Sequence, residues 1–285
     1  MTALPRLAAA CAATLLCLHF APPAAHAQSE PQPVGAALTH AKDSYEPLSG
    51  QPGKDVVWVP TPQALVDRML EMAGVTPQDY LVDLGSGDGR TVITAAQRGT
   101  RALGIEYNPD MVILSKRAAE AEGVADRARF VQGDIFESDF SQATVVTLFL
   151  LPDLNLRLRP TLLDMKPGTR VVSNTFTMGD WTPDQSIDAG GNCTSYCRAY
   201  KWIIPAKVAG IWKLPEGELA LDQTYQMLTG TIELAGKAVP IADARMDGDA
   251  IAFTADGRKF TGSVAGDRMT VASAGRSWTA ARATK

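Results

Sequence analysis

Residues 81–89 read Leu-Val-Asp-Leu-Gly-Ser-Gly-Asp-Gly. An apolar run ends at Asp83, and glycines follow at positions 85, 87 and 89. Val92, Ile93 and Ala96 then fall on one face of a helix. We therefore predict a buried strand that turns sharply into an amphipathic helix. Glycine suits such a turn because some positions require positive φ, and because a side chain would hold the backbone away from a ligand.

Three other glycine-rich motifs do not fit this stretch. The dinucleotide-binding pattern G-x-G-x-x-G needs glycine where Arg90 stands, and a phosphate-binding P-loop needs a Gly-Lys-Ser/Thr ending that is absent. The nucleophile elbow G-x-S-x-G needs glycine where Leu84 stands. The stretch instead resembles the S-adenosylmethionine (SAM) loop of class I methyltransferases. This resemblance implies a SAM site that includes Asp83, Gly85, Ser86 and Gly87.

Two further acidic residues end predicted strands, in the order that the resemblance implies. Residues 101–106 are expected to form strand two, and Glu106 at its end is placed to accept hydrogen bonds from both ribose hydroxyls. Residues 128–134 are expected to form strand three, and Asp134 resembles the residue that accepts from the adenine amino group. Either residue alone also fits a solvated strand end, so the inference depends on the combination.

The alternation of strands and helices continues as far as residue 176. Strands are expected over 143–151 and 169–176, with helices that begin at Asn108-Pro109 and near Pro152-Asp153. We therefore predict an α/β, Rossmann-like class I methyltransferase fold with a mostly parallel seven-stranded sheet. Residues 200–214 are expected to supply its last two strands.

A narrower resemblance covers about residues 56–182. It is carried by the stretch 82–90, by Gly104-Ile-Glu106-Tyr-Asn108 and by Leu150-Leu-Pro-Asp-Leu-Asn155. Pro60-Thr-Pro62 and Asp180-Trp181 add to it. These motifs resemble the family of the ATP synthase c-subunit lysine methyltransferase and its bacterial relatives. The resemblance implies a SAM-dependent N-methyltransferase whose acceptor is a protein lysine.

An apolar mouth for the acceptor amine is expected at the end of strand four. Desolvation lowers the pKa of a lysine, so that an apolar wall favours the neutral amine that reacts. Asp153 and Asn155 are candidates to orient this amine, although helix capping is the simpler role for each. The residues expected to form the mouth are Phe149, Leu150, Leu151 and Pro152, with Trp58 covering it from the N-terminal side.

The first 27 residues have the features of a secretory signal peptide. Arg6 precedes an apolar run from Leu7 to Phe20, and Ala25-His26-Ala27 fits a cleavage site. The run is short for a bilayer span, so an uncleaved anchor is the weaker alternative. Residues 28–55, rich in Pro, Gly, Gln and Ser, are expected to form an extended linker. We therefore predict a periplasmic or secreted protein, although SAM is made in the cytoplasm and would have to be brought to it.

Cleavage would leave only Cys193, Cys197 and His40 among the cysteines and histidines. Two cysteines four positions apart in an exported protein predict a disulfide, with two buried thiols in a reduced protein as the alternative. With its one histidine in the linker, the chain is not expected to use imidazole chemistry or to hold a metal. The net charge of −4, with no basic stripe, argues against nucleic acid as the main partner.

The pattern changes at about residue 215. Glycines fall at 248, 257, 266 and 275, and Asp247-Gly248 and Asp256-Gly257 have the form of hairpin turns. We predict an antiparallel meander or small barrel over 215–285, after a methyltransferase domain over 56–214. Its expected role is to stabilise the first domain or to bind a ligand or substrate.

Two classes of function stay open at this point. The first is a SAM-dependent methyltransferase that acts on a protein lysine, with a small molecule as an alternative acceptor. The second is an exported, non-catalytic module that keeps the fold and binds a nucleoside or another ligand, because fold alone does not decide function. The oligomeric state is not predicted.

Overall fold

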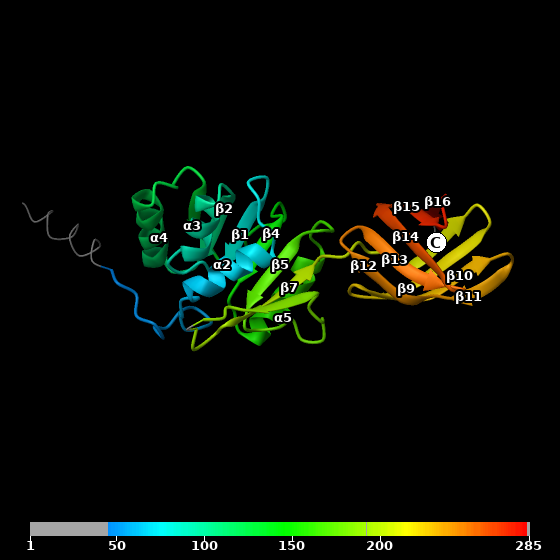
Figure 1. Cartoon of the computed structure of the whole chain (residues 1–285). Helices are drawn as coiled ribbons and strands as arrows, with labels where there is room; N and C mark the ends of the chain where they lie inside the picture. The colour runs from blue at the N-terminus through cyan, green and yellow to red at the C-terminus, as the bar shows by residue number, and fades with distance from the viewer. Residues whose placement is uncertain (1–44, 192, 284–285) are drawn as a thin grey trace, which may run out of the picture. The chain divides into compact units, whose positions relative to one another are not determined.

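The computed structural model describes residues 45–191 and 193–283, which contain two β-sheets (Figure 1). The predicted signal peptide lies outside the described residues. The first sheet has the order β3-β2-β1-β4-β5-β7-β6. Strands β1 to β5 run parallel, and β7 runs antiparallel to its neighbours β5 and β6. Its strands are β1 (Tyr80–Leu84), β2 (Arg101–Glu106), β3 (Ala128–Gln132), β4 (Val145–Leu148), β5 (Arg170–Asn174), β6 (Gln185–Asp188) and β7 (Arg198–Ile203).

Helices cover both faces of this sheet because successive strand residues point to opposite sides. In β1, Leu81 joins the core beneath three helices, whereas Val82 and Leu84 join the core beneath a fourth helix. The three helices are α2 (Gln63–Met72), α3 (Arg90–Gln97) and α4 (Pro109–Ala121), and the fourth is α5 (Pro152–Leu163). The predicted Rossmann-like methyltransferase fold is therefore confirmed. Asn108 caps α4 as expected, since its side chain accepts from the Asp110 N–H.

The second sheet closes on itself as an antiparallel barrel, because β9 at one end of the sheet pairs with β10, which lies next to β11 at the other end. Trp212, Phe253 and Phe260 are buried in its interior. The predicted turns at the four glycines join β12 to β16 in sequence. Its strands are β8 (Gly210–Leu214), β9 (Gly217–Thr224), β10 (Met227–Leu234), β11 (Lys237–Pro240), β12 (Ala242–Asp247), β13 (Ala250–Ala255), β14 (Arg258–Ala265), β15 (Arg268–Ser273) and β16 (Arg276–Arg282).

The prediction that residues 200–214 supply two strands of the first sheet is wrong for the second of them. Residues 210–214 form β8, which pairs with β9 and β16, so the barrel begins before the expected boundary at 215. Pro205 separates β8 from β7, and proline has no N–H to continue a ladder. The missing strand is β6, a short edge strand whose largely exposed, polar sequence has little strand signal.

Hydrogen bonds connect the methyltransferase domain to the barrel. The Trp181 indole is fully buried, and its Nε1 donates to Oε1 of Gln226 at 2.8 Å. Gln226 Nε2 in turn donates to the Thr182 carbonyl at 2.8 Å. The ring of Tyr225 stacks on Trp181, with centroids 5.6 Å apart. Gln226 therefore satisfies polar groups that the surrounding apolar packing removes from water.

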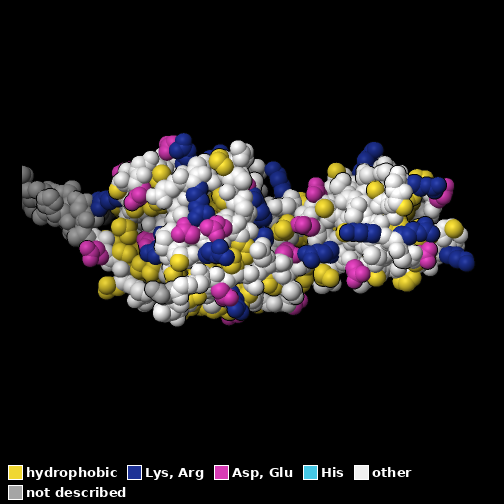
Figure 2. Space-filling model, viewed as in Figure 1, with side chains coloured by type: hydrophobic (Ala, Val, Ile, Leu, Met, Phe, Trp, Pro, Cys, Tyr) yellow, Lys and Arg dark blue, Asp and Glu magenta, His cyan; other side chains and the backbone are white. Residues whose placement is uncertain are grey.

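The face shown in Figure 2 carries acidic and basic side chains interspersed with apolar ones. Within the described residues, no helix has the length and apolar character needed to cross a membrane.

Candidate active site

A pocket opens at the carboxyl ends of β1, β2 and β4, the edge where parallel α/β sheets bind ligands. It is covered by the segment Gly53–Thr61, called here the N-terminal strap. All six residues that the SAM-loop resemblance indicated line this pocket, together with three of the five expected mouth residues. These nine are Asp83, Gly85, Ser86, Gly87, Glu106, Asp134, Trp58, Phe149 and Leu150.

The glycine loop after β1 has the conformation that its sequence indicated. Gly87 has a φ of 55° and Gly89 a φ of 82°, in the left-handed region that side chains disfavour. A Cβ on Gly87 would lie 2.5 Å from the Trp58 indole nitrogen, and one on Gly89 would lie 2.7 Å from the Phe130 ring. Glycine is therefore required here because the strap and the core approach the loop closely.

Glu106 is held by two backbone groups at the end of β2. Its Oε2 accepts from the Gly87 N–H at 2.9 Å, and its Oε1 accepts from the Asn108 N–H at 2.9 Å. A carboxylate has about four acceptor sites, so lone pairs remain for a ligand in the pocket. The arrangement is suited to recognising hydroxyl groups.

Asp83 is a buried carboxyl at the floor of the pocket. The Thr147 hydroxyl donates to its Oδ1 at 2.6 Å. Burial raises the pKa of Asp83 to about 7, against the hydrogen bond from Thr147, and the negative charges of Glu106 and Asp88 raise it further. A cationic ligand would reverse this effect by favouring the ionised form.

Asp134 lies two residues beyond the end of β3 and forms an ion pair with Lys54 of the strap. Its Oδ1 also accepts from the Phe136 N–H at 3.0 Å. The hydrogen bond from Lys54 is the main reason why the pKa of Asp134 lies below its usual value. The Lys54 ammonium also lies 4.9 Å from the centre of the Tyr107 ring.

The expectation that residues 28–55 form a plain linker is wrong for the part that the structure describes. Gly53, Lys54 and Asp55 line the pocket. The Gly50 N–H donates to the Trp58 carbonyl at 2.7 Å, and the Trp58 N–H donates to the Gln51 carbonyl at 2.9 Å, which closes a small hairpin. The Pro52-Gly53 pair is a turn signal that could have indicated it.

A second contact of the strap was not predicted. Arg90 Nη1 donates to the Thr61 carbonyl at 2.9 Å, and Arg90 also forms an ion pair with Asp88. Arg90 directly follows the glycine motif, so it ties the end of the strap to the cofactor loop.

The other expected mouth residues lie away from the pocket. Leu151 is 46% exposed, and Pro152 is the exposed first residue of α5. Neither lines the pocket, because the chain turns outward where α5 begins. Of the predicted mouth, Trp58, Phe149 and Leu150 line the pocket, and Leu150 packs against Gly85.

Neither candidate for orienting the amine lines the pocket. Asp153 is exposed in the first turn of α5, and the N-cap of that helix is Leu151, so Asp153 does not cap it. Asn155 is fully buried, and its Nδ2 donates to the carbonyls of Phe176 and Thr177 at 3.3 and 3.2 Å. Asn155 therefore fixes the loop after β5 rather than facing a ligand.

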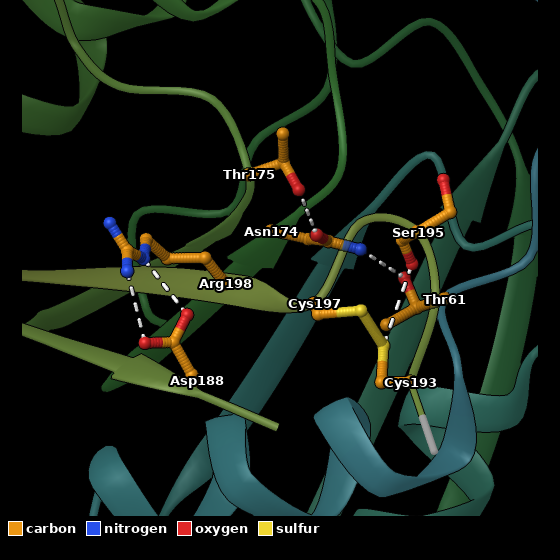
Figure 3. The surroundings of a disulfide bond; sticks show 8 residues. All are labelled: Thr61, Asn174, Thr175, Asp188, Cys193, Ser195, Cys197 and Arg198. Carbon is orange, nitrogen blue, oxygen red and sulfur yellow. Dashed lines mark hydrogen bonds and ion pairs between the residues drawn. A yellow bond between two sulfur atoms is a disulfide. The ribbon is translucent and has the colours of Figure 1, made fainter. Parts of the chain in front are cut away.

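Cys193 and Cys197 form a disulfide in the loop between β6 and β7, with Cα atoms 5.8 Å apart (Figure 3). Figure 3 shows Thr61, at the end of the strap, between this loop and Asn174, whose Nδ2 donates to the Thr61 hydroxyl at 3.1 Å. The disulfide loop therefore lies beside the strap that covers the pocket.

The chain is similar to known methyltransferases. A family model described as the ANTKMT methyltransferase domain matches residues 83–185. A protein-lysine N-methyltransferase of Saccharolobus islandicus is 46% identical over 147 residues, which cover 50% of this chain and 91% of that protein. The human ATP synthase c-subunit lysine N-methyltransferase is 36% identical over 134 residues, covering 47% of this chain and 57% of that protein.

The chain belongs to this lysine methyltransferase family. It is a SAM-dependent methyltransferase, and the non-catalytic alternative is not favoured. A solved structure, an RNA methyltransferase of Salinibacter ruber in complex with S-adenosyl-L-homocysteine, is 51% identical, with a TM-score of 0.49. The matched region covers 53% of this chain and 96% of the chain in that structure.

Proposed function

We propose that this methyltransferase acts on the ε-amino group of a protein lysine. The observation that carries the proposal is the division of the pocket into two chemical regions. Asp83, Glu106 and Asp134 make one region acidic, whereas Phe149 and Leu150 make the end beside β4 apolar. Protein lysine is also the acceptor in the names of the Saccharolobus islandicus and human relatives.

The acidic region fits the polar groups of SAM. We assign Asp83 to the cationic methionine end, Glu106 to the ribose hydroxyls and Asp134 to the adenine amino group. The free lone pairs of Glu106 and the lack of room for a Cβ at Gly87 support this assignment. Asp134 would have to exchange its ion pair with Lys54 for the adenine contact.

The chain contributes orientation and desolvation to the reaction. When bound, SAM supplies an activated methyl group on a positively charged sulfur. With both bound, the pocket would hold the donor methyl group and the acceptor amine close together, which would remove much of the entropy cost of their encounter. The acceptor amine must first lose its proton, and the apolar wall of Phe149 and Leu150 favours that neutral form.

The test is to locate the methyl group after reaction. Purified protein is incubated with labelled SAM and a cell-envelope protein fraction, and the labelled site is identified by mass spectrometry. We expect label on lysine nitrogen, and much less of it with the Glu106→Ala variant as control when SAM is not saturating. Label confined to RNA, to a small molecule or to oxygen would contradict the proposed acceptor while leaving the SAM-dependent activity in place.

We also propose that the protein is exported from the cytoplasm. The sequence of the first 27 residues motivates this proposal, and a disulfide is typical of proteins in oxidising compartments. N-terminal sequencing of protein from the native host should begin at Gln28. An intact N-terminus on cytoplasmic protein would contradict export and would remove the question of how SAM reaches the enzyme.

A further inference from the structure

The disulfide loop places an aromatic side chain against the cofactor pocket. The ring of Tyr196, between the two cysteines, meets the ring of Phe149 edge-on, with centroids 5.1 Å apart. Phe149 lines the cofactor pocket, whereas Tyr196 is 39% exposed. A large aromatic ring that stays open to solvent beside a cofactor pocket is available to a second ligand.

Phe176, in the loop after β5, extends this aromatic surface. Its ring stacks on Phe149, with centroids 6.1 Å apart. Its backbone carbonyl is held by Asn155, whose buried side chain reaches it from α5. The buried Asn155 therefore supports the position of an aromatic residue next to the pocket.

Both flanking loops contain an unusual backbone conformation. Tyr196 has a φ of 53°, and Thr175, directly before Phe176, has a φ of 61°. Positive φ is uncommon for residues other than glycine and is a marked outlier for a β-branched one. Such conformations persist where the surrounding structure imposes them, and they gather at ligand sites.

A second hollow lies on the Tyr196 side of this aromatic surface. It is lined by Tyr196, Cys193 and Ser195 on the loop side, and it shares Val59 and Pro60 with the cofactor pocket. None of its lining residues carries a charge. A lysine side chain that enters this hollow would therefore meet no competing charge among its lining residues.

We propose that Tyr196, Phe149 and Phe176 form the wall that receives the acceptor lysine, and that the disulfide positions Tyr196 in it. The inference rests on the proposed lysine acceptor. Aromatic rings pack against the apolar stem of lysine, and their faces attract the methylated ammonium product. The disulfide constrains Tyr196 to the left-handed conformation that directs its ring to Phe149.

The test uses an S-adenosylhomocysteine analogue in which nitrogen replaces sulfur and carries an aminobutyl chain, a mimic of the lysine side chain. Calorimetry compares its affinity with that of S-adenosylhomocysteine itself. We expect the native protein to bind the analogue at least about tenfold more tightly. Tyr196→Ala should lose most of this gain and keep its affinity for S-adenosylhomocysteine, whereas Tyr196→Phe should keep both.

The disulfide is tested with the Cys193→Ser, Cys197→Ser double variant. We expect this variant to lose the extra affinity for the aminobutyl analogue, as Tyr196→Ala does. Ile211 is an exposed apolar residue on the barrel, so Ile211→Ala is the control and should keep that extra affinity. If Tyr196→Ala still binds the analogue as much more tightly than S-adenosylhomocysteine as the native protein does, the inference is overturned. The same result in the double variant would overturn the role of the disulfide. If the native protein binds the analogue no more tightly than S-adenosylhomocysteine, the aromatic wall is overturned, whatever the acceptor is. If the labelling experiment finds methylated lysine but Tyr196→Ala keeps the extra affinity for the analogue, the inference is refuted and the proposed function stays intact.

Discussion

Glu106 Oε2 accepts a hydrogen bond from the Gly87 N–H at 2.9 Å, across 19 positions of sequence. The carboxylate at the end of β2 thus holds the glycine loop after β1 in place, and this loop in turn orients the carboxylate. Preorganisation of this kind strengthens binding because the ligand does not have to order the site.

Replacing Glu106 with Ala should weaken SAM binding while the fold stays intact. Loss of a charged hydrogen-bond partner costs roughly 1.5–3 kcal/mol, or about ten- to a hundredfold in affinity. Calorimetry measures the affinity, and circular dichroism checks the fold. Glu120→Ala, on the exposed face of α4, is the matched control and should bind SAM normally. Unchanged affinity in Glu106→Ala would mean that the ribose lies elsewhere.

Because the pKa of Asp83 is raised in the folded state, the free energy of unfolding of the ligand-free protein should fall as pH rises. The pKa of Asp83 is about 7 in the folded protein against an ordinary value of 3.8, so the unfolded chain loses this proton first. Stability contributed by the folded-state proton is therefore present below about pH 4 and is lost as pH rises towards about 7. Relative to Asp83→Asn, the native protein should lose on the order of a few kcal/mol of unfolding free energy across this window. Urea unfolding at about pH 5 and about pH 8 measures the difference, and parallel pH dependence of the two proteins would refute it.

Phe149 should matter for turnover, and its neighbour Leu151 should not. Phe149 lines the pocket, whereas Leu151 is 46% exposed and does not. Phe149→Ala should reduce the initial rate of label transfer by about tenfold or more because the acceptor loses its apolar wall, with a smaller change in SAM affinity. Leu151→Ala serves as the control. Equal losses in the two variants would show that the mouth extends beyond the residues that line the pocket.

Gln226→Ala should destabilise the protein without touching the cofactor pocket. It would leave the buried Trp181 indole N–H and the Thr182 carbonyl without their partner. An unsatisfied buried polar group costs about 1–3 kcal/mol, measurable as a lower urea midpoint. Gln185→Ala, on the exposed edge strand β6, is the control and should unfold at the native midpoint. Identical midpoints would mean that water replaces the amide.

Local sequence determined the cofactor half of this protein. The turn from β1 into α3 follows from three glycines after an apolar strand, and the capping of α4 follows from Asn108 before Pro109. The hairpins of the barrel follow in the same way from glycines that adopt positive φ. Each of these signals lies within a few residues of the structure that it specifies, so a single sequence is enough to read it.

The acceptor half was decided by tertiary structure. Lys54 meets Asp134 across 80 positions of sequence, and Tyr196 meets Phe149 although β5 and β6 lie between them in the sequence. The sequence pattern also placed Leu151 in the mouth and treated residues 28–55 as a linker, whereas α5 turns Leu151 outward and the strap covers the pocket. Contacts of this kind impose no period or spacing on the residues that make them. They arise only when packing brings distant segments together, which is why the chain alone did not reveal them.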